Sequence, residues 1–173
     1  MTKKEKAKLL KKLRKTFINI DEITCFTSDL IGLGKSSYFG VYSLKSKSRI
    51  ISSDYNSIEN IDGNLFLVRQ YVSRPEKGRA RDLYGVYSIE LERLVIPVEY
   101  DYISKMNGDL FKIEECEKFG IFSINAKKLI VPTEWISLEV TPEISDKPGG
   151  GIALLVVGKK NVIVEITSTV LMI

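Results

Sequence analysis

Apolar and polar residues alternate over short stretches along most of the chain, and polar or glycine-containing turns separate these stretches. Three stretches open with an aromatic residue and a glycine and then follow nearly the same phrase. They read Phe-Gly-Val-Tyr-Ser-Leu at 39–44, Tyr-Gly-Val-Tyr-Ser-Ile at 84–89 and Phe-Gly-Ile-Phe-Ser-Ile at 119–124. Alternation with a period of two is typical of β-strands. Because one phrase occurs three times, the sequence predicts a repeated β-unit.

The match extends beyond each phrase in the same register. A polar turn leads into a second apolar stretch, which carries a Val-Ile-Pro or Ile-Val-Pro step in the second and third copies and is followed by a large aromatic residue. Proline has no amide hydrogen, so Pro97 and Pro132 are expected to end their strands or to lie on an unpaired edge. A third stretch follows Gly63 and Gly108, where a turn with positive φ would suit glycine.

These observations predict a mainly β fold class. We expect an array of three three-stranded antiparallel meander repeats plus a terminal half-repeat, solenoid or propeller-like, with an N-terminal amphipathic α-helix. Residues 1–20 would form the basic helix, as a cap or an arm, and residues 21–173 the repeat domain. The expected units are about 38–68, 83–113, 118–156 and, in part, 160–173. The pattern leaves open whether the array is open or closed.

The aromatic-Gly-Val phrase, the Val-Ile-Pro step and the aromatic residue after it resemble WG repeats, named for Trp-Gly, over about residues 38–173. Phe39, Tyr84 and Phe119 stand where the consensus has tryptophan, and Ser52 stands where proline is expected in the first unit. The resemblance implies a bacterial, β-rich interaction module without shared catalytic residues. It therefore implies binding, and it names no partner.

The first twenty residues follow a helical pattern. Thr2 and Glu5 fit a capping box. Apolar residues then recur at helical spacing: Leu9, Leu10, Leu13 and Phe17. The other face carries the candidate anion-binding lysines: Lys4, Lys8, Lys11, Lys12 and Lys15. We favour a helix that caps the exposed end of the array, with binding of nucleic acid or an anionic surface as the alternative.

Composition limits the chemistry. The chain has no histidine, which removes the usual general base and the commonest metal ligand, so we expect no enzyme, no metal and no cofactor. Two distant cysteines indicate reduced thiols. No apolar run approaches the roughly 20 residues of a membrane-spanning helix, and no signal-peptide core follows the basic start, so we expect a cytoplasmic protein. Residues 32–37 contain the Gly-Lys-Ser sequence that ends a phosphate-binding loop. That pattern requires glycine at position 29, where this chain has Asp29, so we interpret residues 32–37 as a flexible turn before the array.

Two insertions interrupt the repeat, and inserted loops on a rigid scaffold are usual sites of recognition. The first adds ten residues within 69–84 and is basic: Arg69, Arg74, Lys77, Arg79 and Arg81. The second lies within 139–150 and is acidic: Glu139, Glu143 and Asp146. Each could equally be a solvated surface loop.

The basic charge is concentrated in the predicted N-terminal helix. Residues 1–15 carry +7 and the remaining residues −3, within a formal net charge of +4. We therefore expect a non-enzymatic protein-binding module, of the inhibitor or immunity type, that blocks a bacterial enzyme or toxin through the two loops. The alternative is a nucleic-acid or anionic-surface binder that uses the basic helix and the loop 69–84.

Overall fold

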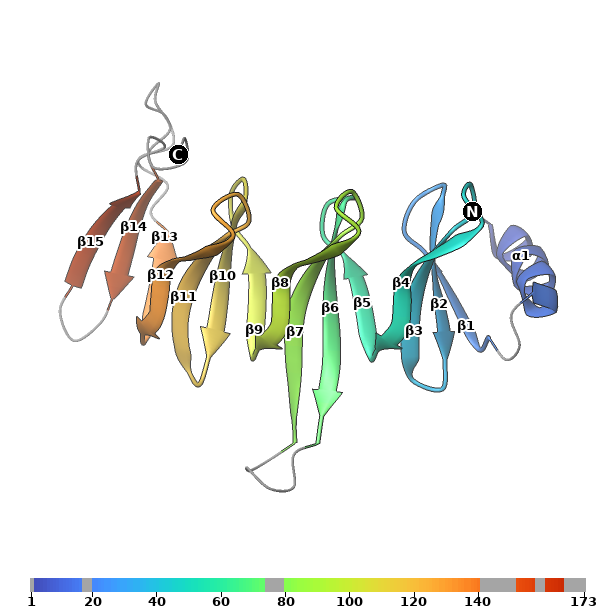
Figure 1. Ribbon diagram of the computed structural model, residues 1–173, viewed down its shortest axis with the longest axis horizontal. Coiled ribbons are helices and arrows are strands. Elements are labelled where there is room, and N and C mark those ends of the chain that lie inside the picture. Colours follow the sequence, from blue (N-terminus) through green and yellow to red (C-terminus); the bar gives the residue numbers. More distant parts are fainter. Residues whose placement is uncertain (1, 17–19, 74–79, 141–151, 158–160, 167–173) are drawn as a thin grey trace. The chain divides into compact units, whose positions relative to one another are not determined.

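The computed structural model describes residues 2–16, 20–73, 80–140, 152–157 and 161–166 (Figure 1). Within these residues the chain is mainly β, which confirms the predicted fold class, and its strands form open antiparallel sheets in chain order. The chain divides into two compact units, Met1–Glu99 and Tyr100–Ile173.

The unit Met1–Glu99 contains the helix α1 (Lys3–Thr16) and two four-stranded sheets. The first sheet has the order β1 (Glu22–Cys25), β2 (Leu30–Lys35), β3 (Tyr38–Ser43) and β4 (Ser48–Tyr55). The second has the order β5 (Ser57–Asn60), β6 (Leu65–Val72), β7 (Arg81–Ser88) and β8 (Arg93–Tyr100).

The unit Tyr100–Ile173 contains two further sheets. The third sheet has four strands, β9 (Tyr102–Lys105), β10 (Leu110–Glu115), β11 (Lys118–Ser123) and β12 (Lys128–Trp135). The fourth has three described strands, β13 (Ser137–Val140), β14 (Ile152–Val157) and β15 (Asn161–Ile166). The expected half-repeat at 160–173 thus begins with a strand, and residues 167–173 lie outside the described part.

The prediction of three-stranded meanders is wrong in two respects: the number of strands in a sheet, and the position along the chain where each sheet begins and ends. The stretch 64–68, which was expected to close the unit 38–68, belongs to β6 and pairs with β5 and β7 in the second sheet. The reason is a change of direction at Asn56. Its amide donates to the Arg69 carbonyl at 2.7 Å, and its side-chain oxygen accepts from the Tyr71 amide at 2.7 Å. The chain therefore leaves β4 and starts a new sheet.

The residues before the first and third sheets make the same pair of hydrogen bonds. The amides of Asp21 and Asp101 donate to the carbonyls of Gly34 and Glu114 at 2.9 and 2.8 Å. Their carboxylates accept from the amides of Ser36 and Cys116 at 2.9 and 2.8 Å. Asp21 and Asp101 thus tie the first strand of a sheet to the turn between its second and third strands, whereas Asn56 binds residues within the longer strand β6.

The first sheet begins well before the first aromatic-glycine phrase. The interpretation of residues 32–37 as a flexible turn is wrong, because Leu30–Lys35 is the strand β2, paired with both β1 and β3. Only Ser36 and Ser37 form the turn, with φ angles of 48° and 71°. Without the aromatic-glycine signal, β1 and β2 could not be assigned to a repeat.

The repeated glycines lie where two strands approach closely. A Cβ atom on Gly120 would come 2.7 Å from the Val131 carbonyl oxygen, and one on Gly40 would come 2.7 Å from the Ile51 carbonyl oxygen. The register shifts at both glycines, which marks a β-bulge. Steric contact with the backbone therefore explains why the phrase keeps glycine, since every side chain would collide there.

The predicted turn glycines and prolines have definite places. Gly63 and Gly108 have φ angles of 82° and 61°, as expected. Pro97 and Pro132 lie within β8 and β12, each the last strand in the order of its sheet. The alternative in which proline ends the strand is therefore wrong, and the alternative in which it lies on an edge strand is confirmed.

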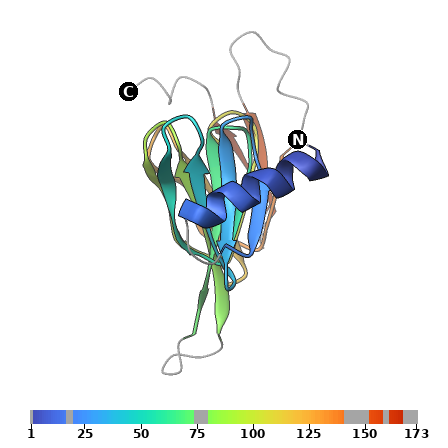
Figure 2. The ribbon, with the colours of Figure 1, turned by 90° about the vertical axis from the view of Figure 1, so that its right-hand side faces the viewer.

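Each face of the first sheet has its own core. On one face α1 packs through Leu13, which is 7% exposed, against Ile23 and Leu33 (Figure 2). On the other face Ile51 packs against Phe66 of the second sheet. The Phe26 and Phe66 rings meet edge to face, with centroids 5.1 Å apart. Alternating side chains of one sheet thus hold both the helix and the second sheet.

Candidate binding surfaces

The helix α1 begins with reciprocal hydrogen bonds at its capping box. The Glu5 amide donates to the Thr2 hydroxyl at 3.3 Å, and the Thr2 amide donates to the Glu5 carboxylate at 2.7 Å. The Thr2 amide and hydroxyl together lower the pKa of Glu5 below its usual value. The carboxylate of Glu5 is therefore engaged in the cap.

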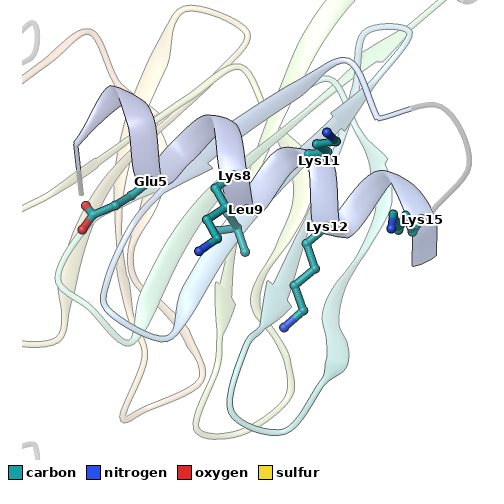
Figure 3. A pocket seen from close by; sticks show the side chains of 6 residues that line it. All are labelled: Glu5, Lys8, Leu9, Lys11, Lys12 and Lys15. Atoms are coloured by element: carbon teal, nitrogen blue, oxygen red, sulfur yellow. The ribbon is translucent and has the colours of Figure 1, made fainter.

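The five lysines that the sequence singled out lie together on the exposed side of α1. At 100° per residue, they share the face opposite Leu13, which is buried against the first sheet. All five are exposed: Lys4, Lys8, Lys11, Lys12 and Lys15. A shallow depression of about 490 Å³ lies along the helix (Figure 3). Its described lining is Glu5, Lys8, Leu9, Lys11, Lys12 and Lys15. We call the five exposed lysines, Lys4, Lys8, Lys11, Lys12 and Lys15, the lysine face.

The first insertion lengthens the β6–β7 hairpin. Arg69 Nη1 and Asp82 Oδ2 are 3.1 Å apart across the two strands, and both side chains are about one-third exposed, at 34% and 37%. Tyr71, in the same hairpin, is 56% exposed. Arg81 lies at the start of β7 and is exposed. The candidate residues Arg74, Lys77 and Arg79 lie outside the described residues. Of this set the structure places only Arg69 and Arg81, on neighbouring strands but three pairs apart in the register.

The second insertion lies between β13 and β14. Glu139 is in β13, where its backbone pairs with Leu155, while Glu143 and Asp146 lie outside the described residues. The first insertion joins the second and third strands of its sheet, and the second joins the first and second strands of another sheet. The two candidate loops therefore belong to different sheets and to different strand connections.

Sequence reasoning missed a hydrogen-bonded turn that three sheets share. Ser123, the serine of the repeated phrase, donates to the Asp109 carboxylate, and the same carboxylate accepts from the Asn125 amide at 3.1 Å. In the first sheet Ser43 donates to Asp29 at 2.9 Å. We call this arrangement the serine turn network. The second sheet uses Asn64 in the place of the aspartate, at 3.5 Å from the Ser88 hydroxyl and 2.8 Å from the Glu90 amide.

The serine hydroxyl of this network also accepts a hydrogen bond. The amides of Ser46, Leu91 and Ala126 donate to it at 3.0, 3.2 and 3.0 Å in the three sheets. Each side chain is thus satisfied by the adjacent turn, and the network supports the fold. The repeated serine in the phrase was its one visible signal, since its Asp or Asn partner is far away in sequence.

In the described part of the chain, no three His, Cys, Asp or Glu side chains gather as a metal would require. Glu115 accepts from the Thr133 hydroxyl at 3.1 Å, and Cys116 and Glu117 form a tight turn with φ angles of 53° and 62°. Cys25 and Cys116 are both exposed, and neither is in a disulfide. The helical residues described include no segment that is long and apolar enough to cross a membrane.

Comparisons with known proteins leave the chain without an assigned family. No family model matches it, and no curated protein matches it. Among solved structures, the chain is similar to the crystal structure of a eukaryotic initiation factor, with 9% identity and a TM-score of 0.47. That match covers 87% of this chain and 44% of the other, so this chain spans less than half the length of that protein. A likeness at this level assigns no function.

Proposed function

We propose that the protein is a non-enzymatic binding module whose sheets form a WG-like repeat array and whose β6–β7 hairpin contacts another protein. The observation that carries this proposal is the length of that hairpin. The equivalent hairpins of the first and third sheets turn directly after Lys35↔Tyr38 and Glu115↔Lys118. β6 and β7 continue for two further pairs, Tyr71↔Asp82 and Val72↔Arg81. An extension of this kind on a shared scaffold is a usual place for recognition.

The side chains of the extension support a protein partner. Tyr71 is 56% exposed, and tyrosine and arginine are enriched among the residues that dominate protein interfaces. The Arg69–Asp82 ion pair joins the strands at the base of the extension, which limits the conformational entropy lost on binding. In the finer form of the proposal, the protein is a cytoplasmic inhibitor or immunity-type protein, and Glu139, Glu143 and Asp146 provide a second contact.

The test is to shorten the hairpin and compare the partners that the full chain captures. Replacing residues 71–82 with two serines would copy the turn at Ser36 and Ser37 while keeping the register of the second sheet. The proposal predicts that a partner cross-linked by the wild type is lost from this variant. Tyr71→Ala should weaken capture, and Tyr38→Ala, at a tyrosine that is 49% exposed on the shorter β2–β3 hairpin, should not. Equal capture by the wild type and the shortened chain would contradict the proposal.

The lysine face supports a second candidate function, the binding of a polyanion such as nucleic acid. Its five lysines project from a helix that Leu13 anchors to the first sheet. Among the described residues that line the depression, the one carboxylate, Glu5, accepts a hydrogen bond from Thr2. Neutralising phosphates releases counterions, so this function predicts affinity that falls steeply with salt. Five contacts on duplex DNA would give a slope of log K against log salt of about −4.5.

Two triple lysine variants separate the two functions when oligonucleotide binding is titrated with salt. Replacing Lys8, Lys11 and Lys12 with glutamine should abolish oligonucleotide binding and leave protein capture unchanged. The matched control replaces Lys105, Lys118 and Lys128, three exposed lysines outside α1, with glutamine. Oligonucleotide binding that both triple variants lose equally would show a nonspecific effect of net charge and would exclude the lysine face as the site.

A further inference from the structure

A small cavity opens between the first and second sheets of the unit Met1–Glu99. Its volume is about 210 Å³, which is below the roughly 300–1,000 Å³ of pockets for drug-sized ligands. It therefore suits a group the size of one side chain. Its lining combines two aromatic rings, an aliphatic side chain, a carboxylate, two hydroxyls and a glycine: Glu22, Thr24, Phe26, Gly32, Phe39, Ser57 and Ile58.

Two glycines of β2 let aromatic rings lie close to the backbone beside the cavity. Gly32 and Gly34 lie on the face of the first sheet that also carries Phe39, as their pairing shows. A Cβ atom on Gly32 would come 3.0 Å from the Phe26 ring, and one on Gly34 would come 2.6 Å from the Phe39 ring. Glu22 and Thr24 are the β1 partners of these two glycines, so they share this face.

The third sheet shows what occupies the same place when the glycine is absent. Gly32 pairs with Val41 two residues after Phe39, and Lys112 pairs with Ile121 two residues after Phe119, so the two positions are equivalent by register. The Lys112 ammonium lies over the Phe119 ring, 4.3 Å from its centroid. The third sheet thus fills this place with a cation on an aromatic ring.

We propose that the cavity of the first sheet binds a primary ammonium group carried on an aliphatic arm, such as the side chain of a lysine from outside the chain. The ammonium would lie on the Phe39 ring as that of Lys112 lies on Phe119, and the arm would contact Phe26 and Ile58. Glu22 supplies the opposite charge, and the hydroxyls of Thr24 and Ser57 supply acceptors. The inference is independent of the hairpin and of the lysine face, because neither contributes a residue to the cavity.

The test is a titration of the full chain with butylammonium, followed by chemical shifts of the aromatic side chains. Saturable binding is expected, with shifts at Phe39 and Phe26, and 1-butanol, a neutral molecule of similar size, should bind more weakly. Phe39→Leu should weaken butylammonium binding roughly three- to tenfold, whereas Phe119→Leu in the third sheet should leave it unchanged. Equal binding of butylammonium and 1-butanol would overturn the inference.

A second variant keeps the proposal testable if Phe39→Leu fails to fold. Glu22 is exposed, so Glu22→Gln should preserve the sheet and weaken butylammonium binding severalfold, while Glu59→Gln, at an exposed position of β5, should have no effect. Unchanged affinity in Glu22→Gln would exclude the site. A lysine within a short extended peptide that binds more tightly than butylammonium identifies a protein side chain as the source. Equal affinity for the peptide and for butylammonium identifies a free amine as the source. Both results are consistent with an ammonium bound in the cavity.

Discussion

The first and third sheets have the same construction but present different side chains on one face. Both turn between their second and third strands through two residues with positive φ, and both pair a serine with an aspartate. They differ on the second strand, where Gly32 and Gly34 of the first sheet correspond to Lys112 and Glu114 of the third. Positions tied to backbone geometry are therefore shared, whereas positions that project from the face vary. The variable positions are where a binding property can differ between sheets.

The shared construction can be broken most severely at the glycine of the repeated phrase. Gly120→Ala should destabilise the third sheet by about 1–3 kcal/mol, because the new Cβ atom would come 2.7 Å from the Val131 carbonyl oxygen. Gly40→Ala should have a similar effect in the first sheet, where the contact with the Ile51 carbonyl oxygen is also 2.7 Å. Urea unfolding followed by the fluorescence of Trp135, the single tryptophan of the sequence, reports on the third sheet.

The control for this change is Gly108→Ala in the same sheet. A Cβ atom there meets nothing within 4 Å, but the φ angle of 61° is unfavourable for alanine. We expect a smaller loss of about 1 kcal/mol, from backbone strain alone. A larger loss for Gly108→Ala than for Gly120→Ala would show that close approach is not what preserves the glycine of the phrase.

These glycines also show how far the sequence could predict the fold. The aromatic-glycine phrase predicted the hairpins β3–β4, β7–β8 and β11–β12 because its glycine and serine have fixed structural tasks. The boundary between sheets could not be predicted, since it depends on Asn56 and Asp101, whose hydrogen-bond partners lie 13 to 15 residues away. The amphipathic pattern predicted the exposed lysines of α1. The cavity could not be predicted, because it depends on how two aromatic rings lie beside the glycines of β2 and on the packing of a second sheet.

The serine turn network gives the next largest effect. Asp109→Ala should destabilise the third sheet by about 1–3 kcal/mol, because the buried Ser123 hydroxyl loses its acceptor and the Asn125 amide loses a charged partner. Asp109→Asn should cost less, since Asn64 occupies this place in the second sheet. A double-mutant cycle with Ser123→Ala measures the coupling by urea unfolding. Additive losses would show that the two side chains do not act together.

Stability at alkaline pH tests a difference between the cores of the second and third sheets. Tyr87 of the second sheet corresponds to Phe122 of the third, and its hydroxyl donates to the Ile50 carbonyl at 3.1 Å. Burial, with a smaller contribution from Glu92, raises the pKa of Tyr87 above its usual value, and burial likewise raises the pKa of Tyr55. Below pH of about 10 both folded and unfolded chains keep these protons, and the full stability is present. Above it the unfolded chain loses them first, so stability falls as pH rises through the folded pKa.

Tyr87→Phe should therefore reduce the loss of stability between pH 8 and 11, measured as the shift of the urea midpoint. At pH 8 the variant should be less stable by about 1 kcal/mol, because the hydrogen bond to Ile50 is gone. Tyr71→Phe is the matched control, since it removes a hydroxyl from a tyrosine that is 56% exposed. The same pH dependence in the wild type and Tyr87→Phe would exclude Tyr87 as a source of the alkaline loss.

The smallest loss of stability is expected at Lys112, on the strand where the third sheet differs from the first. Lys112→Met keeps an unbranched side chain against Phe119 and removes only the ammonium that lies 4.3 Å from the ring centroid. The third sheet should lose about 0.5 kcal/mol, the lower range for a partly exposed cation on an aromatic ring. Because a cation on a ring is held by charge, methionine should not replace it fully even though its volume is similar. A Lys112→Met variant as stable as the wild type, with Lys112→Ala clearly less stable, would assign the contact to the aliphatic stem alone. It would then remove the template for an ammonium in the cavity of the first sheet and leave that site to be judged by titration alone.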